Sequence, residues 1–208
     1  MMFSIIIPAH NSENYIRNGL KSIAMQTLHD YELIVVCDKC TDNTEQIARE
    51  YATKVECADF GKDGLARDKG IEMAQGDWLL FMDDDDWFIH EFVLQILADT
   101  IEKQDYADII AFGYFCKSRG YCPPSEQTIF NPGDAHVWSN CWKRSAVTGA
   151  KFGDASFCSD TYFIRDVKQR TRRYYLLDFP MYYYNFLRPG SQTDLLIRGQ
   201  LRSSNVAR

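Results

Sequence analysis

The sequence predicts an α/β domain built on a mostly parallel sheet. Short apolar runs alternate with stretches of helical periodicity from residue 3 to about residue 115. The runs are too apolar to leave one face in water, which is typical of strands covered by helices on both sides. Polar clusters follow three of these runs, at residues 8–11, 38–42 and 83–86. Because ligands bind outside the carboxyl ends of parallel strands, we expect these clusters to converge at one edge.

The first elements follow directly from the spacing of apolar residues. Residues 3–7, closed by Pro8, form a β-branched run that predicts a buried strand. Residues 13–26 carry apolar side chains at helical spacing, and Ser12 precedes them as a candidate N-cap. Residues 31–37 predict a second buried strand.

The alternation continues to about residue 115. Either Asp42 or Asn43 is positioned to cap the next helix, and Gly76 is a candidate helix stop. The pattern predicts, in order, a helix at 44–51, a strand at 54–57, a helix at 65–75, a strand at 78–82, a helix at 91–103 and a strand at 107–115.

The remaining sequence is less regular. Turn residues dominate 116–134, which predicts an exposed hairpin or loop. Helices are expected at 138–147 and 159–169, and aromatic strands at 174–186. Without a clean linker, residues 1–115 and 116–208 are interpreted as two parts of one unit.

Composition limits the function classes. The chain has 208 residues, 46% of them hydrophobic, and a formal net charge of -6, which argues against a general nucleic-acid binder. Residues 165–208 carry nine Lys or Arg against three acids. This basic region is either a solvated face or a peripheral membrane contact.

No segment reaches the roughly 18–20 apolar residues of a membrane span, and no signal peptide is evident, so we expect a cytoplasmic protein.

Seven scattered cysteines predict reduced thiols rather than a disulfide framework. Cys37 and Cys40 form one C-x-x-C pair. Without a second pair, structural cysteines are favoured over a zinc or redox site.

Four consecutive aspartates follow the apolar run at 78–82. Two carboxylates about 4 Å apart repel by roughly 1 kcal/mol in water and about 4 kcal/mol at an effective dielectric of 20. Because side chains alternate along an extended chain, Asp83 and Asp85 could share a divalent cation while Asp84 faces away. Oxygen ligands suit Mg²⁺ or Mn²⁺. The alternative is a solvated acidic turn.

Several ordered blocks then carry a family resemblance. The segments "FSIIIPAHNSENYIRNGLKSIAMQT", "YELIVVCDKCTDNT", "GLARDKGIEMAQGDWLLFMDDDDW" and "PMYYYNFLRPGSQT" together resemble a family 2 glycosyltransferase with the GT-A fold. The resemblance implies a Rossmann-like α/β/α sandwich, with a nucleotide-sugar half at residues 1–115 and a smaller acceptor-side half at 116–208. It also implies metal-dependent transfer from a nucleotide-sugar, usually a UDP-sugar, to the hydroxyl of a glycan or lipid-linked acceptor, as in surface polysaccharide biosynthesis.

The resemblance assigns roles residue by residue. The family's metal motif matches residues 83–85, with Asp83 and Asp85 as metal ligands and Asp84 near the ribose of the donor. The other donor-binding positions that it implies are Pro8, Ala9, Asn11, Glu13, Asp38 at the uracil edge and Arg67 near the base and phosphates. Asp160 matches the catalytic base, with Asp154 as the alternative, and the resulting in-line displacement would invert the anomeric configuration.

The match departs from the family pattern around the nucleotide and beside the base. Cys37 replaces an acid, Lys39 a glycine and Cys40 a serine, while Ser159 stands where a glutamate usually precedes the base. These changes leave the preferred nucleotide, the sugar, the acceptor and the oligomeric state open.

Three other classes of protein fit the sequence less well. A nucleotidyltransferase would carry a glycine-rich loop after the first strand, and a haloacid-dehalogenase-type phosphatase would carry an aspartate where Pro8 stands. A non-catalytic nucleotide- or carbohydrate-binding module is the remaining alternative. The presence of Asp83, Asp85 and Asp160 favours an enzyme.

Overall fold

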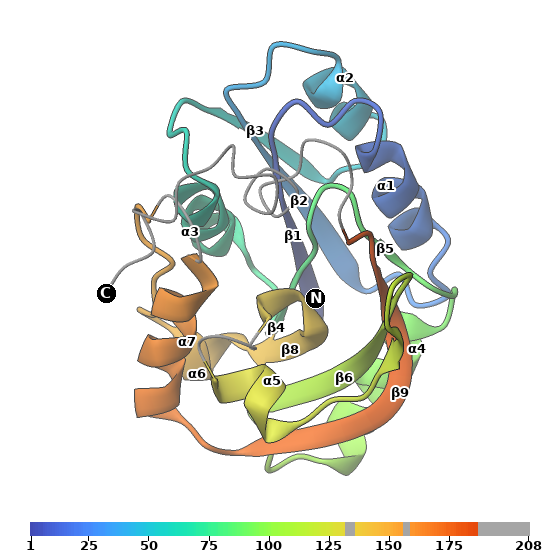
Figure 1. Ribbon diagram of the computed structural model, residues 1–208, viewed down its shortest axis with the longest axis vertical. Helices are drawn as coiled ribbons and strands as arrows, with labels where there is room; N and C mark the ends of the chain where they lie inside the picture. Colours follow the sequence, from blue (N-terminus) through green and yellow to red (C-terminus); the bar gives the residue numbers. More distant parts are fainter. Residues whose placement is uncertain (132–135, 156–158, 187–208) are drawn as a thin grey trace.

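Strands and helices alternate through the N-terminal part of the chain as predicted. The computed structural model describes residues 1–131, 136–155 and 159–186, and Figure 1 shows their arrangement. The first elements are β1 (Phe3–Ala9), α1 (Ile16–Ala24), β2 (Tyr31–Asp38), α2 (Thr44–Arg49), β3 (Lys54–Ala58), α3 (Asp63–Met73) and β4 (Trp78–Phe81). Every residue of β1 and β4 is buried, as the continuous apolar runs require.

The second part of the chain is built from shorter and more varied elements. They are β5 (Trp87–Phe88), α4 (Val93–Lys103), β6 (Ile109–Cys116), β7 (Gly120–Cys122), α5 (Glu126–Phe130), the 3₁₀ helix η1 (Val137–Ser139), β8 (Asn140–Lys143), α6 (Arg144–Val147), α7 (Ser159–Arg170) and β9 (Tyr174–Tyr184). The expected turn-rich segment contains the hairpin of β6 with β7 and the helix α5.

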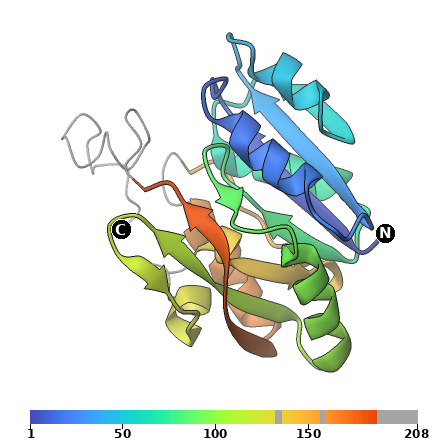
Figure 2. The same cartoon turned by 90° about the vertical axis from the view of Figure 1, so that its right-hand side faces the viewer.

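The described strands form one sheet. Its order is β3-β2-β1-β4-β8-β6-β9-β5, and β7 pairs with β6 beside this path. Strands β1 to β4 are parallel, with Ile5 opposite both Leu33 and Leu80. Beyond β4 the sheet is mixed, because β8 lies antiparallel to β4 and β6 whereas β6 and β9 run parallel (Figure 2).

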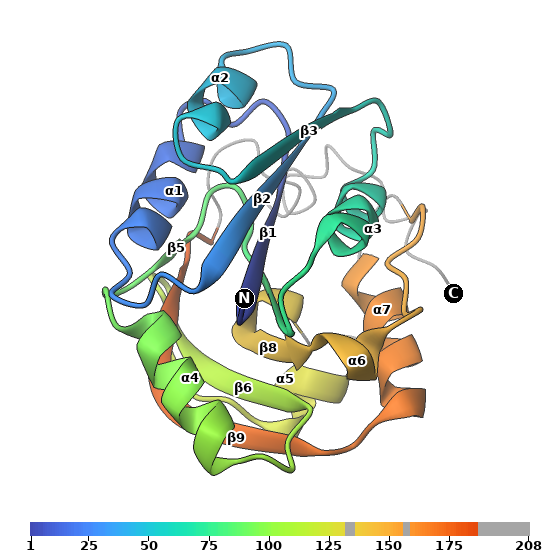
Figure 3. The same ribbon diagram turned by 180° about the vertical axis from the view of Figure 1, so that it is seen from behind.

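Helices cover both faces of the sheet. Helices α1 and α2 lie on one side of β1 and β2, and α3 lies on the other (Figures 1 and 3). Alternate residues of β1 divide between two apolar clusters, so that Ile5 and Ile7 pack with α1 and α4 while Ile6 packs with α3 and α7. Within the described residues, no helix is both long and apolar enough to cross a membrane.

The helix predicted at 138–147 is wrong. This segment forms η1, β8 and α6, and β8 is a central strand between β4 and β6. Trp142 lies opposite Leu79 on one side and Ile109 on the other, with no exposed surface. Pairing with two neighbouring strands therefore overrides the local pattern, which resembled a helix.

The predicted N-cap at Ser12 is also wrong. Helix α1 begins at Ile16, and it is the backbone carbonyl of Ser12 that accepts the Tyr15 and Ile16 N–H groups. The N-cap of α2 is Asn43, one of the two predicted residues, although its side chain makes no capping hydrogen bond. Asp42, the residue before it, accepts the Thr44 N–H through Oδ1 at 3.0 Å.

Candidate active site

The loops after β1, β2 and β4 meet at the carboxyl edge of the parallel strands. The His10 backbone N–H, after β1, donates to Asp84 Oδ2 in the loop after β4 at 3.1 Å. The His10 ring nitrogen Nδ1 lies 2.7 Å from the carbonyl oxygen of Asp38, at the end of β2. The three polar clusters therefore converge, as the alternation of strands and helices predicted.

The four aspartates have different environments. Asp83, Asp84 and Asp85 are half-buried, whereas Asp86 has no exposed surface. Asp83 Oδ1 accepts from Arg67 Nη2 at 2.7 Å, and Asp84 Oδ2 accepts the His10 N–H. The run is therefore neither a freely solvated turn nor a set of four equivalent ligands.

Asp86 is a structural anchor that the sequence analysis missed. Its Oδ2 accepts from the Tyr182 hydroxyl at 2.7 Å and its Oδ1 accepts from the Asn185 N–H at 2.8 Å. The same Tyr182 oxygen accepts the Asp83 N–H at 3.0 Å, so one phenol holds both ends of the run. Burial, together with the charges of Asp85 and Asp83, raises the pKa of Asp86 well above its usual value.

Arg67 joins the aspartates to a second acidic group. It extends from α3, is nearly fully buried, and lies over the Phe152 ring at 5.5 Å. Its Nη1 donates to Asp63 Oδ2 at 2.5 Å and lies 3.8 Å from Asp160 Oδ1, while its Nη2 donates to Asp83. We call these four residues, Asp63, Arg67, Asp83 and Asp160, the carboxylate–arginine cluster.

Asp160 lies in the first turn of α7, with a side chain that is 23% exposed. Its Oδ2 accepts the Val137 N–H at 3.3 Å. Burial raises the pKa of Asp160 and Arg67 lowers it, while Asp83 raises it further, with a net value of about 6. The alternative, Asp154, is exposed and is not part of the cluster.

The remaining predicted donor residues lie around the first two loops. Pro8 and Ala9 are buried in the last part of β1. Asn11 Oδ1 accepts the Thr41 N–H at 2.8 Å, and Glu13 Oε2 accepts the Asn43 N–H at 3.0 Å, so both side chains tie the β1–α1 loop to the β2–α2 loop.

Asp38 is largely committed to the backbone. It is 5% exposed, and its two oxygens accept the N–H groups of Phe60 at 2.7 Å and Lys62 at 2.9 Å. These bonds fix the loop that leads into α3. A carboxylate has about four lone-pair sites, so acceptor capacity remains for a ligand.

The cysteine pair lies at the same edge of the sheet. Cys37 is buried in β2, and the Cys40 thiol donates to the Ala9 carbonyl at 3.4 Å. A hydrogen bond with Cys37 lowers the pKa of the Cys40 thiol to about 7. Among the residues that the structure describes, no group of three or more His, Cys, Asp or Glu side chains is arranged to hold a metal.

Three large aromatic side chains of the second part of the chain belong to the core. Trp138, Trp142 and Tyr182 are 3%, 0% and 0% exposed. Tyr183 is half-buried and stacks on Trp87, with ring centroids 4.3 Å apart. Tyr183 and Tyr184 therefore keep some accessible surface, as the other three do not.

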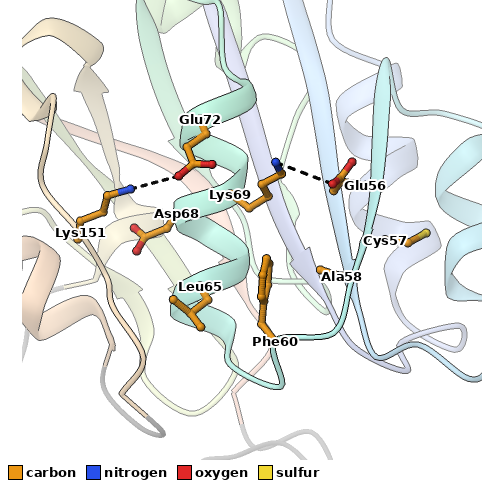
Figure 4. Close-up of a pocket in the computed structure, with 9 residues that line it drawn as sticks. All are labelled: Glu56, Cys57, Ala58, Phe60, Leu65, Asp68, Lys69, Glu72 and Lys151. Carbon is orange, nitrogen blue, oxygen red and sulfur yellow. Dashed lines mark hydrogen bonds and ion pairs between the residues drawn. The ribbon is translucent and has the colours of Figure 1, made fainter.

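A separate hollow of about 620 Å³ is lined by residues of β3, of α3 and of the segment between them, together with Lys151 (Figure 4). Two ion pairs, Lys69 with Glu56 and Lys151 with Glu72, line it. None of the predicted site residues contributes to its lining. The hollow is therefore separate from the carboxylate–arginine cluster.

Comparison with known proteins agrees with this geometry. A family model described as "Glycosyl transferase family 2" matches residues 4–173. The uncharacterized glycosyltransferase EpsJ of Bacillus subtilis is 29% identical, over 93% of this chain and 63% of that protein. The chain thus spans less than two thirds of the length of this relative.

Solved structures show the same fold. The crystal structure of Staphylococcus aureus TarS 1-349 in complex with UDP-GlcNAc matches with a TM-score of 0.78 and 24% identity, over 93% of this chain and 61% of that one. The glucosyl-3-phosphoglycerate synthase of Mycobacterium tuberculosis, in complex with Mg²⁺ and UDP, matches with a TM-score of 0.64 and 17% identity, over 98% of this chain and 81% of that one.

Proposed function

The chain belongs to glycosyl transferase family 2, and we propose that it transfers a sugar from a UDP-sugar to an acceptor hydroxyl. The observation that carries the proposal is the position of Arg67. This residue brings a predicted metal ligand, Asp83, and the predicted base, Asp160, into one cluster at the edge of the sheet where three loops converge. The complexes of TarS with UDP-GlcNAc and of the mycobacterial synthase with UDP support the choice of UDP.

We infer that a divalent cation, Mn²⁺ or Mg²⁺, binds at Asp83 and Asp85. The residues fit such an ion, because their donors are carboxylate oxygens and because three carboxylates surround a single guanidinium, which leaves an excess of negative charge. Two protein ligands leave coordination positions for diphosphate and water. When bound, the cation would offset the charge that develops on the departing diphosphate.

The donor would lie across the first two loops. Pro8, Ala9, Asn11 and Glu13 would shape this surface. Asp38 would accept the N3–H of uracil, a proton that cytosine lacks. Asp84 would approach the ribose. Arg67 would contribute its positive charge beside the phosphates.

Asp160 would act as the general base. Its carboxylate takes the proton of the acceptor hydroxyl as that oxygen attacks the anomeric carbon, and the bond to the diphosphate oxygen breaks in the same step. A pKa of about 6 leaves the carboxylate mostly ionised at neutral pH and still basic enough to accept a proton. Attack from the face opposite the leaving group inverts the anomeric configuration.

The acceptor is proposed to be a growing surface glycan, on its own or linked to a lipid. One curated relative is named poly(ribitol-phosphate) beta-N-acetylglucosaminyltransferase, which is consistent with a cell-envelope acceptor. Residues 1–115 would bind the donor and residues 116–208 the acceptor, within one domain in the cytoplasm.

Peripheral membrane association through the basic region remains a proposal. Of its arginines, Arg172 is paired with Glu126 at 3.7 Å and Arg173 with Asp108 at 2.7 Å, whereas Arg170 lies near Gly149. Unchanged binding to anionic liposomes after replacing all three arginines by glutamine would exclude it.

The decisive experiment is calorimetric titration with UDP, with and without Mn²⁺. We expect Mn²⁺ to strengthen UDP binding by roughly tenfold or more, and Asp85→Ala to abolish that gain. The control Asp105→Ala removes an exposed acid from outside the site and should bind as the parent does. Stronger binding of GDP or CDP would correct the donor class, and failure of any nucleotide to bind would favour a non-catalytic carbohydrate-binding module.

A further inference from the structure

Asp63 is the member of the carboxylate–arginine cluster to which the proposed function assigns no role. It begins α3, one helical turn before Arg67. Its Oδ2 accepts both Arg67 Nη1 at 2.5 Å and Ser159 Oγ at 3.1 Å. Although burial opposes its charge, Arg67 holds the pKa of Asp63 below its usual value, so the group is ionised at neutral pH.

Arg67 Nη1 lies at different distances from Asp63 and from Asp160. This nitrogen lies 2.5 Å from Asp63 Oδ2 but 3.8 Å from Asp160 Oδ1, which is beyond hydrogen-bond distance. Nη2 of the same guanidinium is held by Asp83 at 2.7 Å. The two N–H groups of Nη1 are directed at Asp63 Oδ2 and at Ser159 Oγ, so Nη1 must leave one of these partners before it can donate to Asp160.

The packing around Asp63 leaves this arrangement little freedom. A Cβ added to Gly64 would lie 2.5 Å from the Gly153 oxygen and 2.9 Å from Ser159 Cβ, so only glycine allows α3 to approach the start of α7 this closely. Ser159 is 1% exposed, and its hydroxyl lies between Asp63 and Arg67, 3.3 Å from Nη1.

We propose that Asp63 is a positioning residue that holds the Arg67 guanidinium away from Asp160, so that the base keeps an oxygen free for the acceptor hydroxyl. The inference rests on the proposed function for the role of Asp160. Without Asp63, Nη1 would close on Asp160 and tie up the electron pair that receives the proton. Asp63 would act through Arg67 rather than through contact with the donor or the acceptor.

The kinetic test compares Asp63→Asn with the parent chain in the hydrolysis of UDP-N-acetylglucosamine and UDP-glucose. We expect kcat to fall by about 10²-fold, as for a misplaced catalytic group, while the affinity for UDP with Mn²⁺ stays within about twofold. Glu45→Gln is the matched control, because Glu45 and Arg49 form an exposed ion pair of the same i, i+4 spacing at the start of α2. It should leave kcat unchanged.

A compensating variant separates positioning from mere stability. Asp63→Ala combined with Ser159→Asp moves the carboxylate to residue 159, whose side chain already lies within 3.3 Å of Nη1, and should recover most of the lost kcat. The positioning role is overturned if Asp63→Asn keeps the parental kcat, or if it lowers UDP affinity and kcat together. It is also overturned if the double variant restores the melting temperature without restoring kcat.

A measurement that does not depend on catalytic turnover distinguishes failure of the positioning role of Asp63 from failure of the proposed function. In nuclear magnetic resonance spectra of the metal-free protein, the Arg67 Nη1 protons should keep the parental chemical shift in Glu45→Gln. In Asp63→Asn their chemical shift should change, because Nη1 then donates to Asp160 instead of Asp63. An unchanged Nη1 chemical shift in Asp63→Asn would refute the positioning role even if neither sugar nucleotide is hydrolysed. Failure of UDP to bind the parent chain would instead refute the proposed function.

Discussion

At the scale of single residues, the site depends on one guanidinium shared among three carboxylates. Arg67 is buried and contacts Asp63 and Asp83 directly, with Asp160 just beyond hydrogen-bond distance. Besides burial, which raises the pKa of Asp160, the positive charge of Arg67 lowers it and the negative charges of Asp83 and Asp63 raise it. The proton affinity of the proposed base is therefore a property of the cluster rather than of Asp160 alone.

The pH dependence of turnover follows from that proton affinity. The pKa of Asp160 is raised to about 6, and a base acts only when deprotonated, so kcat for donor hydrolysis should rise between pH 5 and pH 7 and be lost as pH falls through about 6. A bound cation would lower this midpoint. Asp160→Asn should reduce kcat by about 10²–10⁴-fold and remove the acidic limb, with UDP binding retained. A residual profile with the same midpoint in Asp160→Asn would assign the limb to another group.

At the scale of secondary-structure elements, strand β9 fixes the loop that carries the aspartates. Tyr182, fully buried in β9, accepts the Asp83 N–H and donates to the Asp86 carboxylate. The strand also pairs with β5, immediately after the aspartate run, through Trp87 opposite Tyr183. The geometry of the proposed metal ligands thus depends on an element about a hundred residues further along the chain.

Tyr182→Phe tests that dependence. Removing the hydroxyl leaves the buried Asp86 oxygen and the Asp83 N–H without this partner, which should cost about 1–3 kcal/mol of unfolding free energy. The Mn²⁺-dependent gain in UDP affinity should shrink as well, because Asp83 is then less constrained. Urea unfolding and calorimetry measure the two effects. The control Tyr183→Phe keeps the ring that stacks on Trp87, so it should change neither the unfolding free energy nor the gain in UDP affinity. Equal effects of the two substitutions would contradict the role of Tyr182.

The same scale explains what the sequence could predict. Strands β1, β2 and β4 were predictable because each is a continuous apolar run followed by polar residues, and the convergence of Asp38, Asp83 and the first loop follows from their parallel order. Strand β8 could not be predicted in this way, because its short sequence becomes a strand only by pairing with β4 and β6.

The anchoring role of Asp86 was equally hidden. Four adjacent aspartates are alike in sequence, and the partner that distinguishes Asp86 lies at residue 182. Asp63 resembled any acid at the start of a helix, where the helix dipole alone would favour it. In both cases, the defining contact is made by an element far away in the chain.

At the scale of the whole molecule, the two halves of the chain share one sheet and one core. Strand β8, from the second half, lies between β4 and β6 of the first half. Trp142 on β8 packs edge-on against Phe163 of α7, in an apolar cluster that also includes Ile6, Ile34 and Phe81. Because each half contributes to this cluster, neither half should keep its structure without the other.

Trp142→Ala tests this coupling. The side chain is fully buried, and its indole N–H donates to the Val137 carbonyl at 3.0 Å, so its removal should cost about 3–5 kcal/mol. Domains are typically stable by about 5–15 kcal/mol, so a loss of this size should leave the variant folded. Its urea midpoint should be clearly lower than that of the parent chain. Tyr106→Ala, which truncates a ring that is 50% exposed, should shift stability by no more than about 0.5 kcal/mol.

The shape of the urea unfolding transition shows whether the two halves of the chain fold as one domain or as two. If the halves fold as a single domain, circular dichroism and loss of UDP binding should report the same urea midpoint in the parent chain, and both midpoints should fall together in Trp142→Ala. If UDP binding survived in Trp142→Ala while part of the circular dichroism signal was lost, residues 1–115 would be an independent donor-binding domain. Coincident transitions would mean that the proposed donor and acceptor sides of the site form only when the entire sheet is assembled.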